Sequence, residues 1–489
     1  MAVRTIERSK PSNHPETSLR SRRPQGALDA MKRLTCLLTL LVVAMCGRPV
    51  SAQGLLGGLL STATQDVSST VDGLLGQPQG VIVRTNLGLA GLQSVCASNG
   101  CTVVGNLDGS EGQVFLVQPA QGLIPDVLAA VLNLVDGIID AEPDQLLVLP
   151  VSTNLGPFQN TIPSNLYQTS PVKYFGTTVW NGYVNQPAAQ IIGVPQAQST
   201  FHVTGAGTVA DIDTGVDPNH PALKPVLLQG YDFTRNQPGG SEMTDLGGAS
   251  GSACSACQAA FVDQHTAAML DQHTAAMLDG SPYSAFGHGT EVMGMIHLVA
   301  PTAHLLPLKA FSSNGTGTLS NILRAIYYAV QNNANVINMS FELSSSSTEL
   351  SDAINYANSY NVVCAASAGN DGEDEIVYPA GLQPQVMGVA STNDSEQRSS
   401  FSNYGDQVVW VAAPGENIIT TYPFGSYSVT SGTSFTSPMV AGTAALLLSV
   451  QPNTNQSSAS AAIANADWIG PNMGYGELDV YRALSSVQP

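Results

Sequence analysis

The sequence predicts an α/β protein whose main domain has a mostly parallel β-sheet with helices on both faces. Short, continuously apolar segments alternate with longer segments of helical periodicity over residues 191–489, which is typical of a parallel sheet buried on both sides. Hydrophobic residues make up 43% of the chain and charged residues only 11%, as in a well-packed globular protein. The 489 residues are enough for several domains.

Charge is distributed unevenly along the chain. Residues 1–48 contain 9 of the 17 Lys and Arg but only 3 of the 36 Asp and Glu, so the remainder, with 8 basic and 33 acidic residues, has a formal charge of −25. Such a surface repels phosphate backbones and anionic lipids, so we expect neither nucleic acid nor membrane as a partner. Few charges with acids in excess also favour a secreted protein that works in mildly acidic surroundings.

The N-terminal 52 residues are predicted to be an extension and a signal peptide. Residues 1–30 are polar and basic without an apolar period, so we expect translation to start at Met31. A basic pair, the apolar run 34–46 and the small residues 50–52 then form the pattern of a cleaved secretory signal, too short to span a bilayer. The expected localisation is secreted and extracellular, without membrane attachment once the signal is removed.

Two segments precede the main domain. Residues 53–78 have the composition of a flexible spacer, and residues 79–150 predict a small α+β unit in the order strand, helix, strand pair, helix, strand. Residues 151–190 are rich in Pro, Asn, Gln, Ser and Tyr and lack periodicity, which predicts a linker. In the α+β unit, the expected elements are strands at 81–84, 113–117 and 146–149, a helix at 125–134 and a turn between Cys96 and Cys101.

The main domain is expected over residues 191–489. Its predicted strands are 208–212, 304–308, 336–339, 362–366, 386–390 and 408–412, and its predicted helices are 289–298, 319–331, 348–359 and 434–449. Ligands of parallel sheets bind at the carboxyl ends of the strands. Asp213 and Asn370 both follow strand ends and are therefore candidates for a site.

Three polar residues lie at the ends of these elements. Asp213 ends a strand, His288 opens a helix, and Ser434 precedes an apolar helix. Each alone has a structural explanation as a turn residue or helix cap. However, a helix N-terminus favours negative charge, and an acyl-transfer nucleophile needs that setting because its attack creates an oxyanion. Together the three have the chain order Asp, His, Ser of the subtilisin triad.

From about Ile192 to the C-terminus the sequence resembles the subtilisin-like serine peptidases, or subtilases. The resemblance implies a subtilisin-like fold for residues 191–489 and an inhibitory pro-domain at 79–150, which the chain removes by self-cleavage within 151–190. It rests on four separated motifs in the family's order: Asp213-Thr214-Gly215, His288-Gly289-Thr290, Ser367-Ala368-Gly369-Asn370 and Gly432-Thr433-Ser434.

The resemblance implies a serine endopeptidase that acts through an acyl-enzyme on protein or peptide substrates, with its own pro-domain as an intramolecular inhibitor. Ser434 would be the nucleophile and His288 the base that later acts as acid. Asp213 would orient the imidazole. The Asn370 side chain and the Ser434 N–H would stabilise the oxyanion.

Two stretches resemble the family's substrate-binding segments. Gly315, Thr316 and Gly317 match the strand that pairs with the substrate backbone. Ser340 and Phe341 match the start of a Ser-Leu-Gly segment, where Glu342 replaces the glycine and changes the wall of the specificity pocket. Val377 suggests a pocket of modest depth. We expect broad endopeptidase activity.

No cofactor or metal is expected. His265 and His273 belong to a tandem octapeptide near Cys254 and Cys257, which is a candidate zinc set. However, residues eight apart on a helix are offset by about 80°, so we favour a surface insertion with a local disulfide. The calcium-binding loop that many subtilases have before the Val299-Ala300-Pro301 phrase is missing.

The cysteines fit an oxidising compartment. Two lie in the signal. Cys96 with Cys101 and Cys254 with Cys257 are candidate local disulfides, and Cys364, in an apolar strand, is expected to be a buried free thiol.

Two alternative functions remain. Acid-acting relatives of the sedolisin type share the Gly-Thr-Ser motif but use a Glu base and an Asp in the oxyanion hole, and His288 and Asn370 argue against that type. A catalytically silent binding protein on the same fold would keep the architecture without the reaction. A fluorophosphonate probe distinguishes an active serine peptidase from a silent binding protein because it labels only an activated serine.

Overall fold

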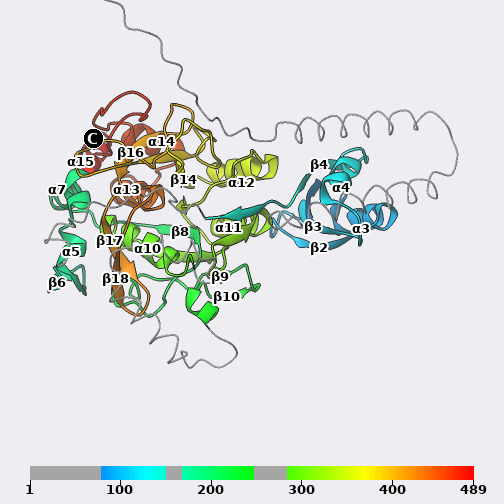
Figure 1. The fold of residues 1–489 in the computed structure, drawn as a ribbon, viewed down its shortest axis with the longest axis horizontal. Coiled ribbons are helices and arrows are strands. Elements are labelled where there is room, and N and C mark those ends of the chain that lie inside the picture. The colour runs from blue at the N-terminus through cyan, green and yellow to red at the C-terminus, as the bar shows by residue number, and fades with distance from the viewer. Residues whose placement is uncertain (1–78, 150–167, 247–283, 489) are drawn as a thin grey trace, which may run out of the picture. The chain divides into compact units, whose positions relative to one another are not determined.

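The computed structural model describes residues 79–149, 168–246 and 284–488, and Figure 1 shows their secondary structure. The predicted signal peptide, spacer, tandem repeat and Cys254–Cys257 pair lie outside the described residues.

The main domain contains an eight-stranded sheet in the order β10-β9-β11-β8-β13-β14-β15-β16. All neighbouring strands are parallel except β9 and β10. The six predicted strands are present, with ends shifted by a few residues. The strands are β8 (Thr208–Asp213), β9 (Tyr231–Asp232), β10 (Gln237–Pro238), β11 (His304–Lys309), β13 (Val336–Met339), β14 (Val363–Ser367), β15 (Met387–Thr392) and β16 (Val411–Pro414).

Helices cover both faces of this sheet because its longer strands, from β11 to β16, are buried almost throughout. In β8, Val209 packs into the apolar cluster that contains α10 (His288–Val299) and α13 (Ser437–Val450). Its neighbours Ala210 and Ile212 pack into the cluster that contains α11 (Leu319–Gln331) and α12 (Thr348–Ser359). The predicted α/β fold class is therefore confirmed (Figure 1).

Helix α13 is apolar on all sides. The segment Thr433–Val450 is long and apolar enough to cross a membrane by length and composition, but 89% of it is buried inside the protein. A helix without a polar face is expected at the centre of a core. The apolar character of this helix is therefore explained by its place in the main-domain core.

The N-terminal α+β unit has a four-stranded antiparallel sheet in the order β2-β3-β1-β4. Two helices pack on it around an apolar cluster that includes Leu92 and Leu128. The predicted element order is correct. The elements are β1 (Val81–Thr85), α3 (Gly88–Asn99), β2 (Cys101–Asn106), β3 (Val114–Pro119), α4 (Pro125–Leu132) and β4 (Ile138–Pro143).

One predicted strand of this unit was assigned to the wrong sheet. Residues 146–149 do not close the unit, because β4 already occupies that edge beside β1. Strand β5 (Leu146–Val148) instead pairs with β12 (Thr316–Thr318) of the main domain.

The Cys96–Cys101 disulfide is not formed in the structure. Both thiols are buried and free. The predicted turn is confined to Gly100, which ends α3 in a left-handed conformation (φ 72°). Cys364 is a buried free thiol, as expected.

Residues 168–190 of the predicted linker contain secondary structure. Within 168–190 the chain forms a hairpin and two short helices, and the side chains of Tyr174 and Tyr183 are buried in the main-domain core. Because the aromatic residues of this segment show no periodicity, the sequence did not predict that they would be buried. The remaining elements are β6 (Pro171–Tyr174), β7 (Thr177–Trp180), α5 (Asn181–Val184), α6 (Pro187–Ile191), α7 (Val194–Phe201), η1 (Glu242–Leu246), β17 (Ile418–Tyr422), β18 (Ser426–Thr430), η2 (Thr433–Phe435), α14 (Gln456–Ile463) and α15 (Val480–Ser485).

Candidate active site

Asp213 and His288 form a buried pair at the carboxyl edge of the sheet. Asp213 is the last residue of β8 and His288 the first of α10. The imidazole Nδ1 lies 2.8 Å from Asp213 Oδ1 and 2.9 Å from Oδ2. A carboxylate only accepts hydrogen bonds, so Nδ1 carries the proton and Nε2 is the basic nitrogen.

Glu242 joins the two elements that carry this pair. Its Oε2 accepts hydrogen bonds from Gly287 N at 2.7 Å and from Thr214 Oγ1 at 3.2 Å, and its Oε1 accepts from Thr290 Oγ1. Thr214 Oγ1 also accepts from Gly289 N at 2.9 Å. The end of β8 is thereby held against the start of α10. Sequence analysis missed Glu242, because it lies far from both motifs in the chain.

The pKa of His288 is raised to about 9. Burial acts to lower it, but the negative charge and hydrogen bonds of Asp213 outweigh burial, with smaller contributions from Glu291 and Asp211. The Asp213 carboxylate therefore stabilises the imidazolium form of His288.

Ser434 lies in a turn in which the next residue contacts His288. It was predicted in the first turn of a helix over 434–449, but it belongs to the short 3₁₀ turn η2 before α13, because Pro438 favours a helix start near Ser437. The ring of Phe435, the next residue, contacts the His288 ring at a centroid distance of 5.6 Å. Ser434 Oγ is buried and has no hydrogen-bond partner among the described residues.

Asn370 reaches the same turn from the loop after β14. Its side-chain Oδ1 accepts hydrogen bonds from Thr433 N and Thr433 Oγ1, both at 2.9 Å. These two donors fix the amide orientation, since Oδ1 must face Thr433. The opposite side of the amide, Nδ2, lies 3.7 Å from the position that a Cβ on Gly432 would occupy.

A buried polar network lies behind the turn. Asn338 Nδ2 donates to Asp211 Oδ1 at 2.9 Å, and Asn338 Oδ1 accepts from Ser437 Oγ at 2.9 Å. Burial and the Asp213 charge raise the pKa of Asp211 well above its usual range. Asp211 lies two residues before Asp213 and so on the same face of β8, a signal that could have identified it from the sequence.

Ser340 connects this network to the turn. Its Oγ donates to the backbone oxygen of Ser434 at 2.9 Å. The side chain of Phe341 is fully buried and packs on Phe311 with ring centroids 5.4 Å apart. Phe341 can therefore contact a substrate only through its backbone.

The strand expected to pair with substrate is already paired. Residues 316–318 form an antiparallel ladder with β5, in which Gly317 faces Leu147, and Leu149 N donates to Gly315 O at 2.9 Å. The side chains of Leu147 and Leu149 are 3% and 2% exposed. A segment of the same polypeptide thus makes the main-chain contacts predicted for substrate.

Residues just before β5 contact the N-termini of two helices. Asp144 accepts from Ser320 N and Oγ in the first turn of α11, at 2.8 and 2.7 Å. Glu142 accepts from Ser347 Oγ and Thr348 N at the start of α12, at 2.5 and 3.1 Å. Carboxylates at helix N-termini are favourable because they satisfy unpaired N–H groups.

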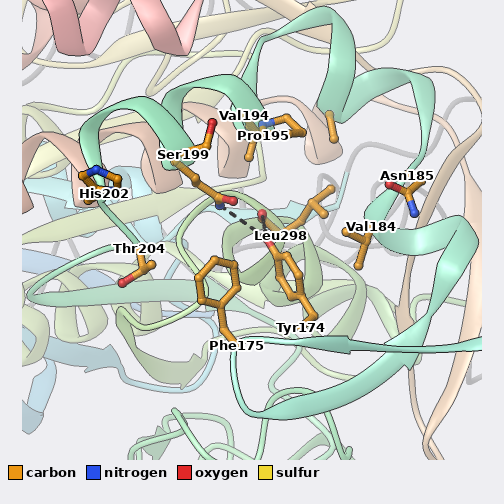
Figure 2. A pocket seen from close by; sticks show the side chains of 12 residues that line it. Tyr174, Phe175, Val184, Asn185, Val194, Pro195, Ser199, His202, Thr204 and Leu298 are labelled. Atoms are coloured by element: carbon orange, nitrogen blue, oxygen red, sulfur yellow. Dashed lines mark hydrogen bonds between the residues drawn. The ribbon is translucent and has the colours of Figure 1, made fainter.

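A separate cavity of about 490 Å³ lies away from these residues. Figure 2 shows its largely apolar lining, which includes Tyr174, Phe175 and Leu298. Tyr174 OH donates to Leu298 O at 2.5 Å, and Gln198 Nε2 donates to Val299 O at 2.9 Å. None of the predicted site residues lines this cavity.

No group of three or more metal-ligating side chains occurs within residues 79–149, 168–246 and 284–488. His265 and His273 lie outside these ranges.

A parallel sheet covered on both faces, with an Asp–His pair and a Ser-bearing turn at its carboxyl edge, is typical of a hydrolase with a serine nucleophile. Residues 205–478 match the model of the subtilase family. The chain belongs to this family and is a subtilisin-like serine peptidase.

Curated relatives agree with this assignment. The chain is 35% identical over 280 residues to a thermophilic serine proteinase of Bacillus sp. (strain AK1), covering 57% of this chain but only 61% of that protein. It is 34% identical over 303 residues to thermitase of Thermoactinomyces vulgaris, covering 61% of this chain and 95% of thermitase. It is 33% identical to subtilisin E of Bacillus subtilis (strain 168), covering 58% and 67%.

A solved structure shows the same fold. Fervidolysin from Fervidobacterium pennivorans superposes with a TM-score of 0.63 at 22% identity, covering 84% of this chain and 61% of fervidolysin.

Proposed function

We propose that this chain is a secreted serine endopeptidase that hydrolyses peptide bonds through an Asp213–His288–Ser434 triad and is made as a self-processed precursor. The observation that carries the proposal is the Asp213–His288 pair, joined at 2.8 and 2.9 Å, together with the Phe435–His288 contact, which brings the turn that bears the buried Ser434 hydroxyl to this pair.

In the first step, His288 Nε2 takes the proton from Ser434 Oγ as the oxygen attacks the substrate carbonyl. Asp213 keeps Nδ1 protonated and stabilises the imidazolium that forms. His288 then gives its proton to the leaving amine, which leaves an acyl-enzyme on Ser434. Water repeats the sequence to release the acid.

The oxyanion of each tetrahedral intermediate needs donors. Asn370 Nδ2 and the Ser434 N–H supply them, in the proposed mechanism. The two hydrogen bonds from Thr433 to Asn370 Oδ1 support this role, because they leave the Nδ2 side of the amide facing away from Thr433. A donor fixed before the reaction stabilises developing charge without reorganisation.

Residues 79–150 act as the inhibitory pro-domain in this proposal. Its support is the antiparallel pairing of β5 with β12, which occupies the backbone groups that substrate would use. The contacts of Asp144 and Glu142 with α11 and α12 supply further attachment. Cleavage within 151–190 separates the pro-domain from the peptidase.

Secretion is proposed from the signal pattern that starts at Met31. A catalytically silent protein with the same signal would also be secreted, so secretion does not test catalysis.

Intact-mass analysis of wild-type protein and Ser434→Ala, both expressed without the signal, tests the proposal. We expect wild-type protein to lose a fragment ending between about 150 and 190, while Ser434→Ala stays whole. A fluorophosphonate probe should label wild-type protein only. Unlabelled wild-type protein that also stays whole would favour the alternative, a catalytically silent binding protein on this fold.

A further inference from the structure

The segment after Ser340 carries a partly buried carboxyl group, that of Glu342, which forms no ion pair with a described residue. Glu342 lies two residues after Ser340, whose Oγ donates to Ser434 O. Its Oε2 is buried and has no hydrogen-bond partner among the described residues. A buried carboxylate oxygen without a partner is costly, so its presence at this place calls for a ligand or a proton.

Three separate segments of the chain meet at this carboxyl group. A Cβ on Gly369 would lie 2.4 Å from Glu342 Oε2, so the carboxyl group touches the backbone next to Asn370. Leu343 and Tyr378 exchange two backbone hydrogen bonds of 2.7 and 2.9 Å, which brings the Val377 segment to the segment after Ser340. Glu342 therefore lies between the proposed oxyanion donor and the residue expected to limit pocket depth.

The charged side chains that act on Glu342 are themselves acids. Burial raises the pKa of Glu342 to about 8, and the charges of Asp371 and Glu375 on the loop after β14 add to this effect. From the segment after β15, Asn403 contributes a neutral amide whose Nδ2 would lie 2.3 Å from the same Gly369 Cβ.

Four of the eight basic residues of the described chain pair with other acids, and the other four donate hydrogen bonds to neutral oxygens. Arg84 pairs with Glu349 and Lys309 with Asp245, and none of the ion pairs within the described residues involves Glu342. The described part of the chain therefore supplies no ion-pair partner for Glu342.

We propose that Glu342 is a specificity-determining residue, which binds the Lys or Arg side chain of the substrate residue immediately before the scissile bond. The scissile carbonyl must lie between Ser434 and Asn370, so the side chain next to that carbonyl reaches the wall formed by Glu342 and Gly369. An ammonium or guanidinium group there forms charge-assisted hydrogen bonds with the Glu342 carboxylate, which forms no ion pair with a described residue. This inference rests on the proposed peptidase function.

The test compares peptides that differ only in the residue before the scissile bond: Lys, Arg, or norleucine, which has a similar aliphatic stem without charge. At pH 9, where the Glu342 carboxyl is ionised, we expect wild-type kcat/KM to be at least about tenfold higher for Lys than for norleucine, the size of effect expected for a charge-assisted hydrogen bond. The Lys/norleucine ratio should fall below pH 7. Ionisation of His288 affects both substrates equally and cancels in the ratio.

Glu342→Gln keeps the shape of the side chain and removes its charge. We expect the Lys/norleucine ratio to fall about tenfold or more, while norleucine turnover stays within a few-fold of wild type. Glu375→Gln is the matched control, because it removes an exposed neighbouring acid and should change the ratio less than twofold. An unchanged ratio in Glu342→Gln would overturn the proposal.

Failure of the two proposals can be told apart. If a fluorophosphonate labels neither wild-type protein nor Glu342→Gln, and neither cleaves the norleucine peptide, the peptidase proposal itself fails. If both are labelled and cleave norleucine but wild-type protein shows no preference for Lys or Arg, only the specificity proposal fails.

Discussion

Asp144 accepts two hydrogen bonds from Ser320, one from the backbone N–H at 2.8 Å and one from the hydroxyl at 2.7 Å. The two residues are 176 positions apart in the chain. The aspartate belongs to the proposed pro-domain and the serine to the first turn of α11 in the peptidase. In the proposed precursor, this contact therefore attaches the inhibitory segment to the peptidase.

We expect Asp144→Ala in the isolated pro-domain to weaken inhibition of mature enzyme by about tenfold to a hundredfold. A hydrogen bond to a charged group contributes about 1.5–3 kcal/mol to binding, and the variant leaves the donors of α11 without this acceptor. Inhibition constants of the added pro-domain measure the effect. Asp136→Ala, at an exposed position of the same unit, is the control and should inhibit like wild type. Equal inhibition by both variants would show that the contact contributes nothing.

The pH profile of kcat/KM should rise with pH through an apparent pKa near 9. His288 must be neutral to accept the Ser434 proton, and Asp213 holds the pKa of His288 at about 9 despite its burial. The rate therefore grows as pH rises and His288 loses its proton. Initial rates of a neutral peptide between pH 5 and 10.5 check this. A maximum below pH 7 would contradict it and would instead favour the acidic working range suggested by composition.

Asn370→Ala should lower kcat by about 10²–10³ with little change in KM, because an oxyanion donor acts mainly in the transition state. Thermal denaturation should be recorded beside the kinetics, since the variant also leaves the donors of Thr433 without Asn370 Oδ1. Asn370→Asp keeps an acceptor for Thr433 but replaces the amide donor, so it should be similarly slow. Asn370→Asp with wild-type kcat would argue against the oxyanion role.

Gly442→Ala should destabilise the fold by about 1–3 kcal/mol through overpacking. A Cβ at this position of α13 would lie 2.7 Å from Val299 Cβ on α10 and 3.3 Å from Ile296 O. Urea denaturation of the mature enzyme measures the free energy of unfolding. Ser449→Ala, on the exposed side of the same helix, is the control and should differ little from wild type. A neutral Gly442→Ala would mean that α10 and α13 can move apart at little cost.

The order of motifs and the period of the apolar segments were enough to predict the sheet, its covering helices and the residues at its carboxyl edge. These features depend on local patterns that a single sequence displays. Helix bounds at 319–331 and 348–359 agree with the structure to the residue, because each has a clear polar N-cap followed by an apolar period.

Features that depend on distant partners could not be predicted in this way. The segment 146–149 has the composition of any short apolar strand, and nothing local shows that it pairs with residues 316–318. Glu242 gave no signal because its three donors come from two other motifs. The hairpin within 168–190 was missed because its aromatic residues are buried by elements far along the chain.

The pairing of β5 with β12 also has a kinetic consequence. Both strands belong to one polypeptide, so the local concentration of β5 at β12 is set by the chain and does not change when the solution is diluted. In the proposed precursor, external peptides therefore compete poorly for β12 at any protein concentration. Once the chain is cut, the same strand becomes a separate molecule whose occupancy falls on dilution. Release into a large volume, rather than the cut alone, would then determine when foreign proteins gain access.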